Sequence, residues 1–265
     1  MSFSATARLV ALGVHGEARA GRARDVPAAT RRLAARATPA WLRSRTVEAL
    51  LRRFEAWLLP GIAAHYVARK SVLWQAAQQA VAGGVERVVV LAPGCDGIGP
   101  ALRELGVDVV EVVHPREARA RAQLAAPEAP VARVIADLGA EADVVRRLAD
   151  DPRPTLWIAE AVLMYLAPAA ARALLRGARS ATAPQTLLFT AMAPRADGSA
   201  GFGDASPWVA RWLASVREPF RWALAPDALR RVLARAGFDV IDSANETASP
   251  EFCAGEAIYV ARRNR

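Results

Sequence analysis

The chain has 265 residues, 53% of them hydrophobic, so it can bury the core of one large domain, and intrinsic disorder is excluded as a description of the whole. The net charge of +9 comes almost entirely from arginines, but these are scattered and rarely alternate with aromatic residues, so no nucleic-acid partner is predicted. No apolar run reaches the roughly 18 to 20 residues of a membrane helix, and the amino terminus lacks an apolar signal-peptide core, so we expect a cytoplasmic protein without a membrane partner. Cys95 and Cys253 match neither a metal-ligand spacing nor a disulfide framework, so no metal site is predicted.

Residues 1–84 are expected to form a helical cap. Residues 41–59 and 65–81 carry apolar residues at helical spacing, and Pro60 with Gly61 separates these two helices. Gly83 and Gly84 form a helix stop, which ends the cap.

Strands and helices alternate through residues 85–193. The expected strands are 87–92, 107–113, 131–135, 155–159 and 186–193, and the expected helices are 99–105, 115–124, 139–149 and 168–180. This alternation predicts an α/β domain with a doubly wound, mostly parallel sheet, whose ligands bind at the carboxyl ends of the strands.

The alternation is interrupted at residues 194–222. This segment is rich in Gly, Ser and Pro and then becomes amphipathic around Trp208 and Trp212, so we expect an insertion that acts as a lid. Residues 223–265 complete the domain with a helix over 226–236 and closing strands over 238–241 and 257–261. The simplest organisation is therefore a single domain.

The most specific motif is E-x-V-L-M-Y-L, which begins at Glu160 and follows the buried strand 155–159. It resembles the leucine carboxyl methyltransferase type of S-adenosylmethionine-dependent O-methyltransferases. The resemblance extends from about Pro60 to the carboxyl end, whereas the first 55 or so residues match poorly. It implies the seven-stranded, Rossmann-like sheet of class I methyltransferases with one antiparallel strand, and S-adenosylmethionine as the cofactor of the core at residues 85–193.

The turn after the first strand departs from the family pattern L-G-A-G-x-D-T. Gly94 and Asp96 fit, but Ala92 replaces the first glycine and Pro93 has no backbone N–H. The resemblance implies that Gly94 lets the cofactor approach the backbone, although the turn could also be an ordinary strand-to-helix connection. A dinucleotide-binding loop is not predicted, because the glycine order G-x-G-x-x-G is absent.

The second strand ends in Glu111-Val112-Val113-His114-Pro115, where the family has E-V-D-H-P and its aspartate holds the ribose of the cofactor. Val113 stands in place of that aspartate and cannot accept a hydrogen bond. Glu111 lies one pleat earlier on the same side of the strand and could replace it, at a shift of roughly 6 to 7 Å.

The resemblance implies roles for four further residues. Asp137 and Leu138 would contact adenine, unless Asp137 caps the next helix. Arg69 would clamp the methionine carboxylate, unless it is a solvated surface residue.

Glu160 would accept a hydrogen bond from the methionine ammonium, unless it pairs with a structural arginine. Tyr165 is a candidate substrate contact or a core residue. No Ser/His/Asp or Cys/His arrangement is found, so no catalytic base is predicted.

The resulting hypothesis is an S-adenosylmethionine-dependent O-methyltransferase acting on a carboxylate or hydroxyl of a small molecule, such as a secondary metabolite. The alternative is a degenerate methyltransferase fold, which would bind ligands, act as a scaffold or perform other chemistry. The sequence does not determine the acceptor or the oligomeric state.

Overall fold

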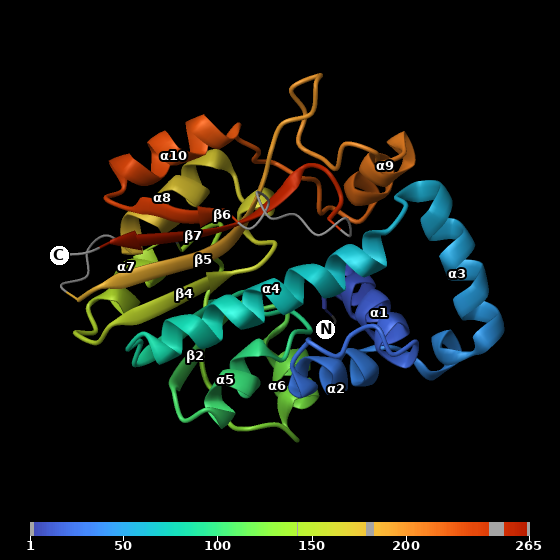
Figure 1. Ribbon diagram of the computed structural model, residues 1–265, viewed down its shortest axis with the longest axis horizontal. Coiled ribbons are helices and arrows are strands. Elements are labelled where there is room, and N and C mark those ends of the chain that lie inside the picture. The colour runs from blue at the N-terminus through green and yellow to red at the C-terminus, as the bar shows by residue number, and fades with distance from the viewer. Residues whose placement is uncertain (1–2, 142, 179–182, 244–251, 264–265) are drawn as a thin grey trace.

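The computed structural model describes residues 3–141, 143–178, 183–243 and 252–263, and in them helices cover both faces of one seven-stranded sheet (Figure 1). The strand order is β3-β2-β1-β4-β5-β7-β6, and β7 is antiparallel to both of its neighbours while the other pairs are parallel. The strands are β1 (Arg87–Leu91), β2 (Asp108–Val113), β3 (Ala132–Ile135), β4 (Thr155–Ala159), β5 (Gln185–Met192), β6 (Asp239–Ser243) and β7 (Glu256–Arg263). This arrangement confirms the predicted class I methyltransferase fold.

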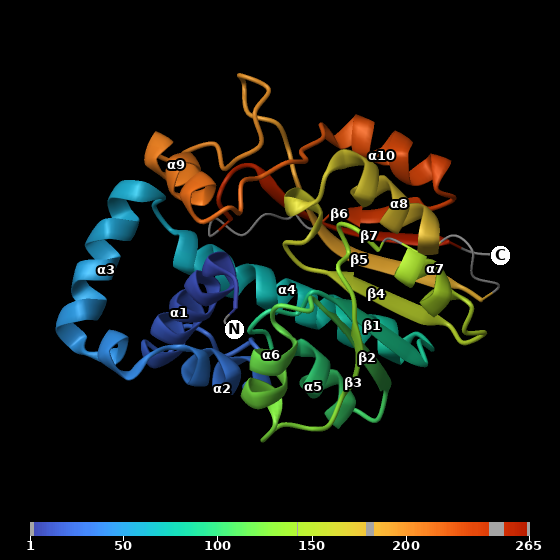
Figure 2. The ribbon, with the colours of Figure 1, turned by 180° about the vertical axis from the view of Figure 1, so that it is seen from behind.

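The central strands are apolar on both faces because helices cover both faces. In β1, Val88 and Val90 belong to a core shared with helices α4 and α5, whereas Val89 and Leu91 pack with α7, α8 and α10. Figure 2 shows this second group of helices in front of the sheet. The helices of the sheet are α4 (Ile62–Ala82), α5 (Ile98–Glu104), α6 (Ala118–Ala125), α7 (Asp143–Ala149), α8 (Pro168–Ala178) and α10 (Pro226–Arg235).

Three amino-terminal helices lie beside the carboxyl end of the parallel strands. Helices α1 (Ala5–Arg19) and α2 (Ala28–Ala37) pack on each other, while α3 (Arg45–Leu58) arches away from the sheet (Figure 1). None of the α3 side chains that the structure describes is buried.

The prediction of a single helix over residues 41–59 is wrong. A 3₁₀ turn (Ala40–Arg43) is separated from α3 by Ser44, whose Oγ accepts from Val47 N at 3.3 Å. This side chain caps α3, and a capping residue requires an extended backbone that interrupts a continuous helix.

Several other predicted helices differ at their ends: the helix expected over 65–81 spans Ile62–Ala82, and the one expected over 115–124 spans Ala118–Ala125. The helix expected over 139–149 begins only at Asp143, because Asp137 holds the preceding residues in a turn and accepts from Gly139 N at 2.8 Å. The helix expected over 168–180 ends at Ala178, and residues 179 and 180 lie outside the described residues.

Residues 194–222 contain helix α9 (Pro207–Ser215) and return to the sheet beside the 3₁₀ turn η2 (Leu163–Tyr165). The backbone N–H groups of Arg221 and Trp222 donate to the carbonyl oxygen of Met164 at 2.6 and 3.2 Å. The segment is therefore anchored directly behind the Glu160 motif. In the part of the chain that the structure describes, no helix is long and apolar enough to cross a membrane.

Gly97 provides a test of the packing between α2 and the loop after β1. A Cβ atom at this position would lie 2.3 Å from the backbone nitrogen of Thr30 and 2.4 Å from the carbonyl carbon of Ala29. We expect Gly97→Ala to lower the free energy of unfolding by at least about 1–3 kcal/mol, because backbone atoms must move. Gly16→Ala, in the interior of α1, is the control and should raise it by about 0.5–1 kcal/mol. Urea unfolding monitored by circular dichroism measures both, and equal effects would contradict the packing described.

Candidate functional site

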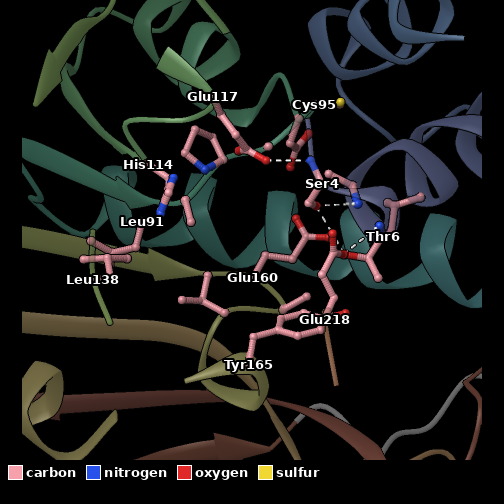
Figure 3. Close-up of a pocket in the computed structure, with 18 of the residues that line it drawn as sticks. Ser4, Thr6, Leu91, Cys95, His114, Glu117, Leu138, Glu160, Tyr165 and Glu218 are labelled. Atoms are coloured by element: carbon pink, nitrogen blue, oxygen red, sulfur yellow. Dashed lines mark hydrogen bonds between the residues drawn. The ribbon is translucent and has the colours of Figure 1, made fainter. Parts of the chain in front are cut away.

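A cavity of about 830 Å³, here called the main cavity, lies at the carboxyl ends of β1 to β4. Its walls come from the loops that follow these four strands, and its roof comes from α1 and from residues 214–221. This is the edge at which open α/β sheets bind ligands. Figure 3 shows His114 and Leu138 at one end and Glu160, Tyr165 and Glu218 at the other.

One end of the main cavity is built on five charged residues, here called the charge cluster: the buried Arg69, Lys70, Asp96 and Glu256, and the half-buried Glu160. Arg69 donates from Nε to Glu160 and from Nη1 to Glu256, each at 2.9 Å. Lys70 Nζ lies 3.0 Å from both Asp96 Oδ2 and Glu160 Oε1. The cluster thereby joins α4 to the loops after β1 and β4 and to the start of β7.

A histidine extends the charge cluster behind Glu256. Nδ1 of His65 accepts from Cys253 N at 3.2 Å, so Nε2 carries the proton and donates to Glu256 at 2.7 Å. The ring is completely buried and orients this carboxylate toward Arg69.

The carboxylates of the charge cluster differ in proton affinity. Burial opposes ionisation of Glu256, but Arg69 and the His65 hydrogen bond outweigh it and lower the pKa of Glu256 to about 2. Burial likewise opposes ionisation of Asp96, but Lys70 outweighs it and holds the pKa of Asp96 below its ordinary value. For Glu160, burial exceeds the attraction of Lys70 and Arg69, so its pKa is raised.

The backbone on either side of Glu160 and in the loop after β1 is constrained. Ala92 and Ala161 adopt left-handed conformations, with φ of 47° and 51°, which residues other than glycine seldom adopt. The family pattern has glycine at position 92 for this reason. Gly94 also has a positive φ of 53°, and a Cβ there would lie 3.1 Å from Ala7 of α1.

Arg121, which the sequence did not single out, supports this loop from behind. Its Nη1 donates to the carbonyl oxygens of Asp96 at 2.5 Å and Gly94 at 3.3 Å, and its Nε donates to Glu111 Oε2 at 3.0 Å. Arg121 and Glu111 are both completely buried.

The suggestion that Glu111 replaces the ribose-binding carboxylate is wrong. Its oxygens are taken by Arg121 and by Arg133, which lies at 3.3 Å, and the side chain does not line the main cavity. A Cβ atom at Gly99 of α5 would lie only 2.7 Å from Glu111 Oε1, so the Glu111 carboxylate is enclosed beneath this helix.

Val113 does not line the main cavity either, and its side chain is buried in the sheet. The residues that reach the cavity after β2 are His114, Arg116 and Glu117. Glu117 places a carboxylate in the wall of the main cavity, four residues after Val113 in the chain. Glu117 is the N-cap residue of α6, and no motif in the sequence indicated that it would line the cavity.

Asp137 and Leu138 both line the main cavity. Asp137 Oδ1 accepts from Gly139 N at 2.8 Å, and Oδ2 lies 3.5 Å from His114 Nε2. The alternative that Asp137 caps a helix is incorrect in detail, because α7 begins at Asp143 and the residue instead closes a turn.

The roof of the main cavity is held by two carboxylates from distant segments. Glu117 accepts from Ser4 N at 2.7 Å, and Glu218 accepts from Ala5 N at 2.8 Å and Thr6 N at 2.9 Å (Figure 3). Carboxylates are favoured at a helix N-terminus, where backbone N–H groups lack partners. These contacts fix the start of α1 over the cavity, and no sequence motif indicated them.

The structure brings together six of the eight predicted site residues along the main cavity: Arg69, Gly94, Asp137, Leu138, Glu160 and Tyr165. The alternative of a solvated surface Arg69 is wrong, whereas Tyr165 both lines the main cavity and packs against a hydrophobic cluster that contains Met164. Arg69 is buried, and Tyr165 is half-buried against Phe220, with ring centroids 5.3 Å apart.

A seven-stranded sheet, a cavity at its carboxyl edge and the Glu160 motif define a methyltransferase-type domain, and the family comparison agrees. The family model described as leucine carboxyl methyltransferase matches residues 9–179, which is more than half of the chain. The chain therefore belongs to this family of S-adenosylmethionine-dependent methyltransferases. The match begins much earlier than the predicted limit near Pro60, so α1 to α3 are part of the family pattern.

Solved structures similar to the chain are also methyltransferases. Magnesium protoporphyrin IX methyltransferase from Synechocystis PCC 6803, with bound SAH, has a TM-score of 0.49 at 14% identity, covering 82% of this chain and 100% of that chain. The glycopeptide N-methyltransferase MtfA, complexed with S-adenosylmethionine, has 0.47 at 19% identity, covering 72% and 94%. The CcbJ methyltransferase from Streptomyces caelestis has 0.48 at 15% identity, covering 72% and 95%. These scores lie below 0.5, so the family match carries the assignment; no curated protein sequence matches the chain.

The Arg121–Glu111 pair can be tested by removing one partner or both. Arg121→Met leaves Glu111 as a buried charge with only the half-exposed Arg133 nearby, so we expect the free energy of unfolding to fall by about 3–5 kcal/mol. The double variant Glu111→Leu/Arg121→Met removes both charges and should recover part of this loss. Denaturant unfolding measures the effect. A single variant as stable as wild type would contradict the supporting role of this pair.

The lowered pKa of Glu256 predicts acid sensitivity. Because the folded-state pKa of about 2 lies below the ordinary 4.5, its contribution to stability is complete above pH 4.5 and is lost as the pH falls toward 2. We expect the free energy of unfolding of wild type to decrease across this interval, and that of Glu256→Gln to decrease less. Glu86→Gln, at an exposed position, is the control and should keep the wild-type slope. Equal slopes for all three proteins would show that Glu256 is not the responsible group.

Proposed function

We propose that the protein is an O-methyltransferase that binds S-adenosylmethionine in the main cavity and methylates a small molecule. The observation that carries the proposal is the charge cluster beneath Glu160, at the carboxyl edge of the sheet in a chain of this family. Residues 194–222 act as a lid over this site. A cytoplasmic enzyme of secondary metabolism is the setting that we infer.

The charge balance of the cluster supports a cationic ligand. It contains three carboxyl groups and two cations, Arg69 and Lys70. Burial raises the pKa of Glu160 despite the attraction of Lys70 and Arg69, so a positively charged ligand group beside Glu160 would stabilise its carboxylate. S-adenosylmethionine has an ammonium and a sulfonium, and we assign its ammonium to Glu160 and its carboxylate to Arg69.

The other end of the main cavity suits the nucleoside. Leu138 gives an apolar surface and Asp137 a partly exposed carboxylate for adenine, while Gly94 permits close approach of the ligand to the backbone. We assign the ribose hydroxyls to Glu117, whose pKa is raised mainly by burial. This carboxylate takes the role that Val113 and Glu111 do not fill.

The reaction that we infer is an in-line displacement at the methyl carbon. An acceptor oxygen approaches opposite to the sulfur, and the site acts mainly by holding the two molecules in line. No side chain is assigned as a general base. The methionine end of the cofactor is positioned by residues of α4 and of the strand ends.

A second function, ligand binding without methyl transfer, is favoured by Lys70. Its ammonium already lies between Asp96 and Glu160, where it neutralises both carboxylates. If Lys70 keeps both contacts when a ligand binds, no unpaired carboxylate remains for the ammonium of S-adenosylmethionine. The pocket would then bind another ligand without methyl transfer.

Titration calorimetry with S-adenosylmethionine tests the proposed function. We expect wild type to bind, and Glu160→Gln and Glu117→Gln to bind roughly 10- to 100-fold more weakly, since each loses a charged hydrogen bond worth about 1.5–3 kcal/mol. Glu86→Gln is the exposed control. Lack of binding at millimolar cofactor would reject the proposal, and binding without S-adenosylhomocysteine formation on any acceptor would favour the second function.

A further inference from the structure

A second hollow, here called the apolar chamber, has a volume of about 380 Å³ and lies under α9 between α1, α3 and α4. Its walls are mostly aliphatic and aromatic side chains, including Leu12, Leu51, Ile62, Met164, Trp212 and Phe220. Enclosed apolar spaces of this size are typical of small-molecule sites. Neither the family match nor the sequence motifs give this chamber an occupant.

The apolar chamber is adjacent to the main cavity. Five residues line both spaces: Thr6, Val10, Arg69, Ala161 and Tyr165. A molecule in the chamber can therefore meet a molecule in the main cavity only at this junction, which lies beside Glu160. The junction is the place where a methyl group could pass between them.

The charges around the chamber exclude an anionic occupant. Among the described residues that line it, each arginine already has a carboxylate partner: Arg19 and Arg52 pair with Glu48, and Arg69 pairs with Glu160 and Glu256. Carboxylates outnumber these cations. A carboxylate acceptor at the junction would face Glu256 without a cation of its own.

Neutral polar groups are available instead. Nε2 of His15 is buried in the chamber region and has no hydrogen-bond partner among the described residues, and burial lowers the pKa of this ring, which favours its neutral form. At the junction, Thr6 Oγ1 donates to Glu218 at 2.5 Å and the Tyr165 side chain is hydrogen-bonded to Thr6, so these hydroxyl oxygens can serve a ligand as acceptors. Neutral groups of this kind can hydrogen-bond to a ligand hydroxyl without the free-energy cost of burying a charge.

Aromatic rings form much of the chamber wall. The rings of Tyr165 and Phe220 lie 5.3 Å apart, and Phe202 and Phe220 lie 6.0 Å apart with nearly perpendicular planes. Trp208 and Trp212 close the chamber from α9. Ring walls of this kind favour a flat aromatic ligand through stacked and edge contacts.

We propose that the apolar chamber binds the methyl acceptor, and that this acceptor is an uncharged aromatic compound that presents a hydroxyl, not a carboxylate, to the junction. This inference rests on the proposed function. The hydroxyl oxygen forms a bond to the methyl carbon of S-adenosylmethionine, the carbon–sulfur bond breaks with its electron pair passing to sulfur, and the hydroxyl proton passes to water. The products are an aryl methyl ether and S-adenosylhomocysteine.

The test compares two probes with the same ring system, 2-naphthol and 2-naphthoate. Binding to the full chain without cofactor is measured by calorimetry, and methyl transfer by formation of S-adenosylhomocysteine. We expect 2-naphthol to bind at least tenfold more tightly than 2-naphthoate and to be the methylated compound. Equal or tighter binding of 2-naphthoate, or its preferential methylation, would overturn the proposal.

Two variants locate the binding. Leu51→Trp fills the chamber from α3 and should weaken 2-naphthol binding at least tenfold, whereas Trp57→Ala, on the same helix but outside the chamber, should not change it. S-adenosylmethionine binding is measured on both variants and should equal that of wild type. If wild type does not bind S-adenosylmethionine, the proposed function is rejected, but the chamber as the binding site of 2-naphthol is not. Unchanged 2-naphthol binding to Leu51→Trp would reject the chamber as its site.

Discussion

Charged side chains are stable inside a protein only when they pair with each other, and this requirement organises the site around Arg69. Its guanidinium bridges Glu160, which follows β4, and Glu256, which begins β7, while the adjacent Lys70 bridges Glu160 and Asp96. Two consecutive residues of α4 thus hold three separate loops. The position of each loop at the carboxyl edge depends on these pairs, and so does the shape of the main cavity.

A second buried pair has the same function one layer deeper. Glu111 and Arg121 do not reach the main cavity, yet Arg121 fixes the carbonyl groups of the loop after β1. Above the cavity, Glu117 and Glu218 fix the start of α1. The site is therefore supported from below and closed from above by ionic and charge-assisted contacts, while apolar packing provides the sheet that carries them.

The sequence predicted the sheet and its central strands, and six of the eight proposed site residues line the main cavity, because hydrophobic periodicity and the Glu160 motif are local signals. It failed where the decisive contact is between distant segments. Glu111 was misplaced because strand alternation gives the face of a side chain but not its partner, and Arg121 is not distinguishable among many arginines. The break at Ser44 and the turn at Asp137 depend on single side-chain hydrogen bonds, which spacing does not reveal.

We propose that the charge cluster receives the methionine end of S-adenosylmethionine and directs its sulfur toward the apolar chamber. A crystal structure of the protein with bound S-adenosylhomocysteine would test this placement. We expect the amino group of the ligand within hydrogen-bond distance of Glu160, and the sulfur at the junction beside Tyr165. A ligand bound elsewhere, with Lys70 still bridging Asp96 and Glu160, would contradict it.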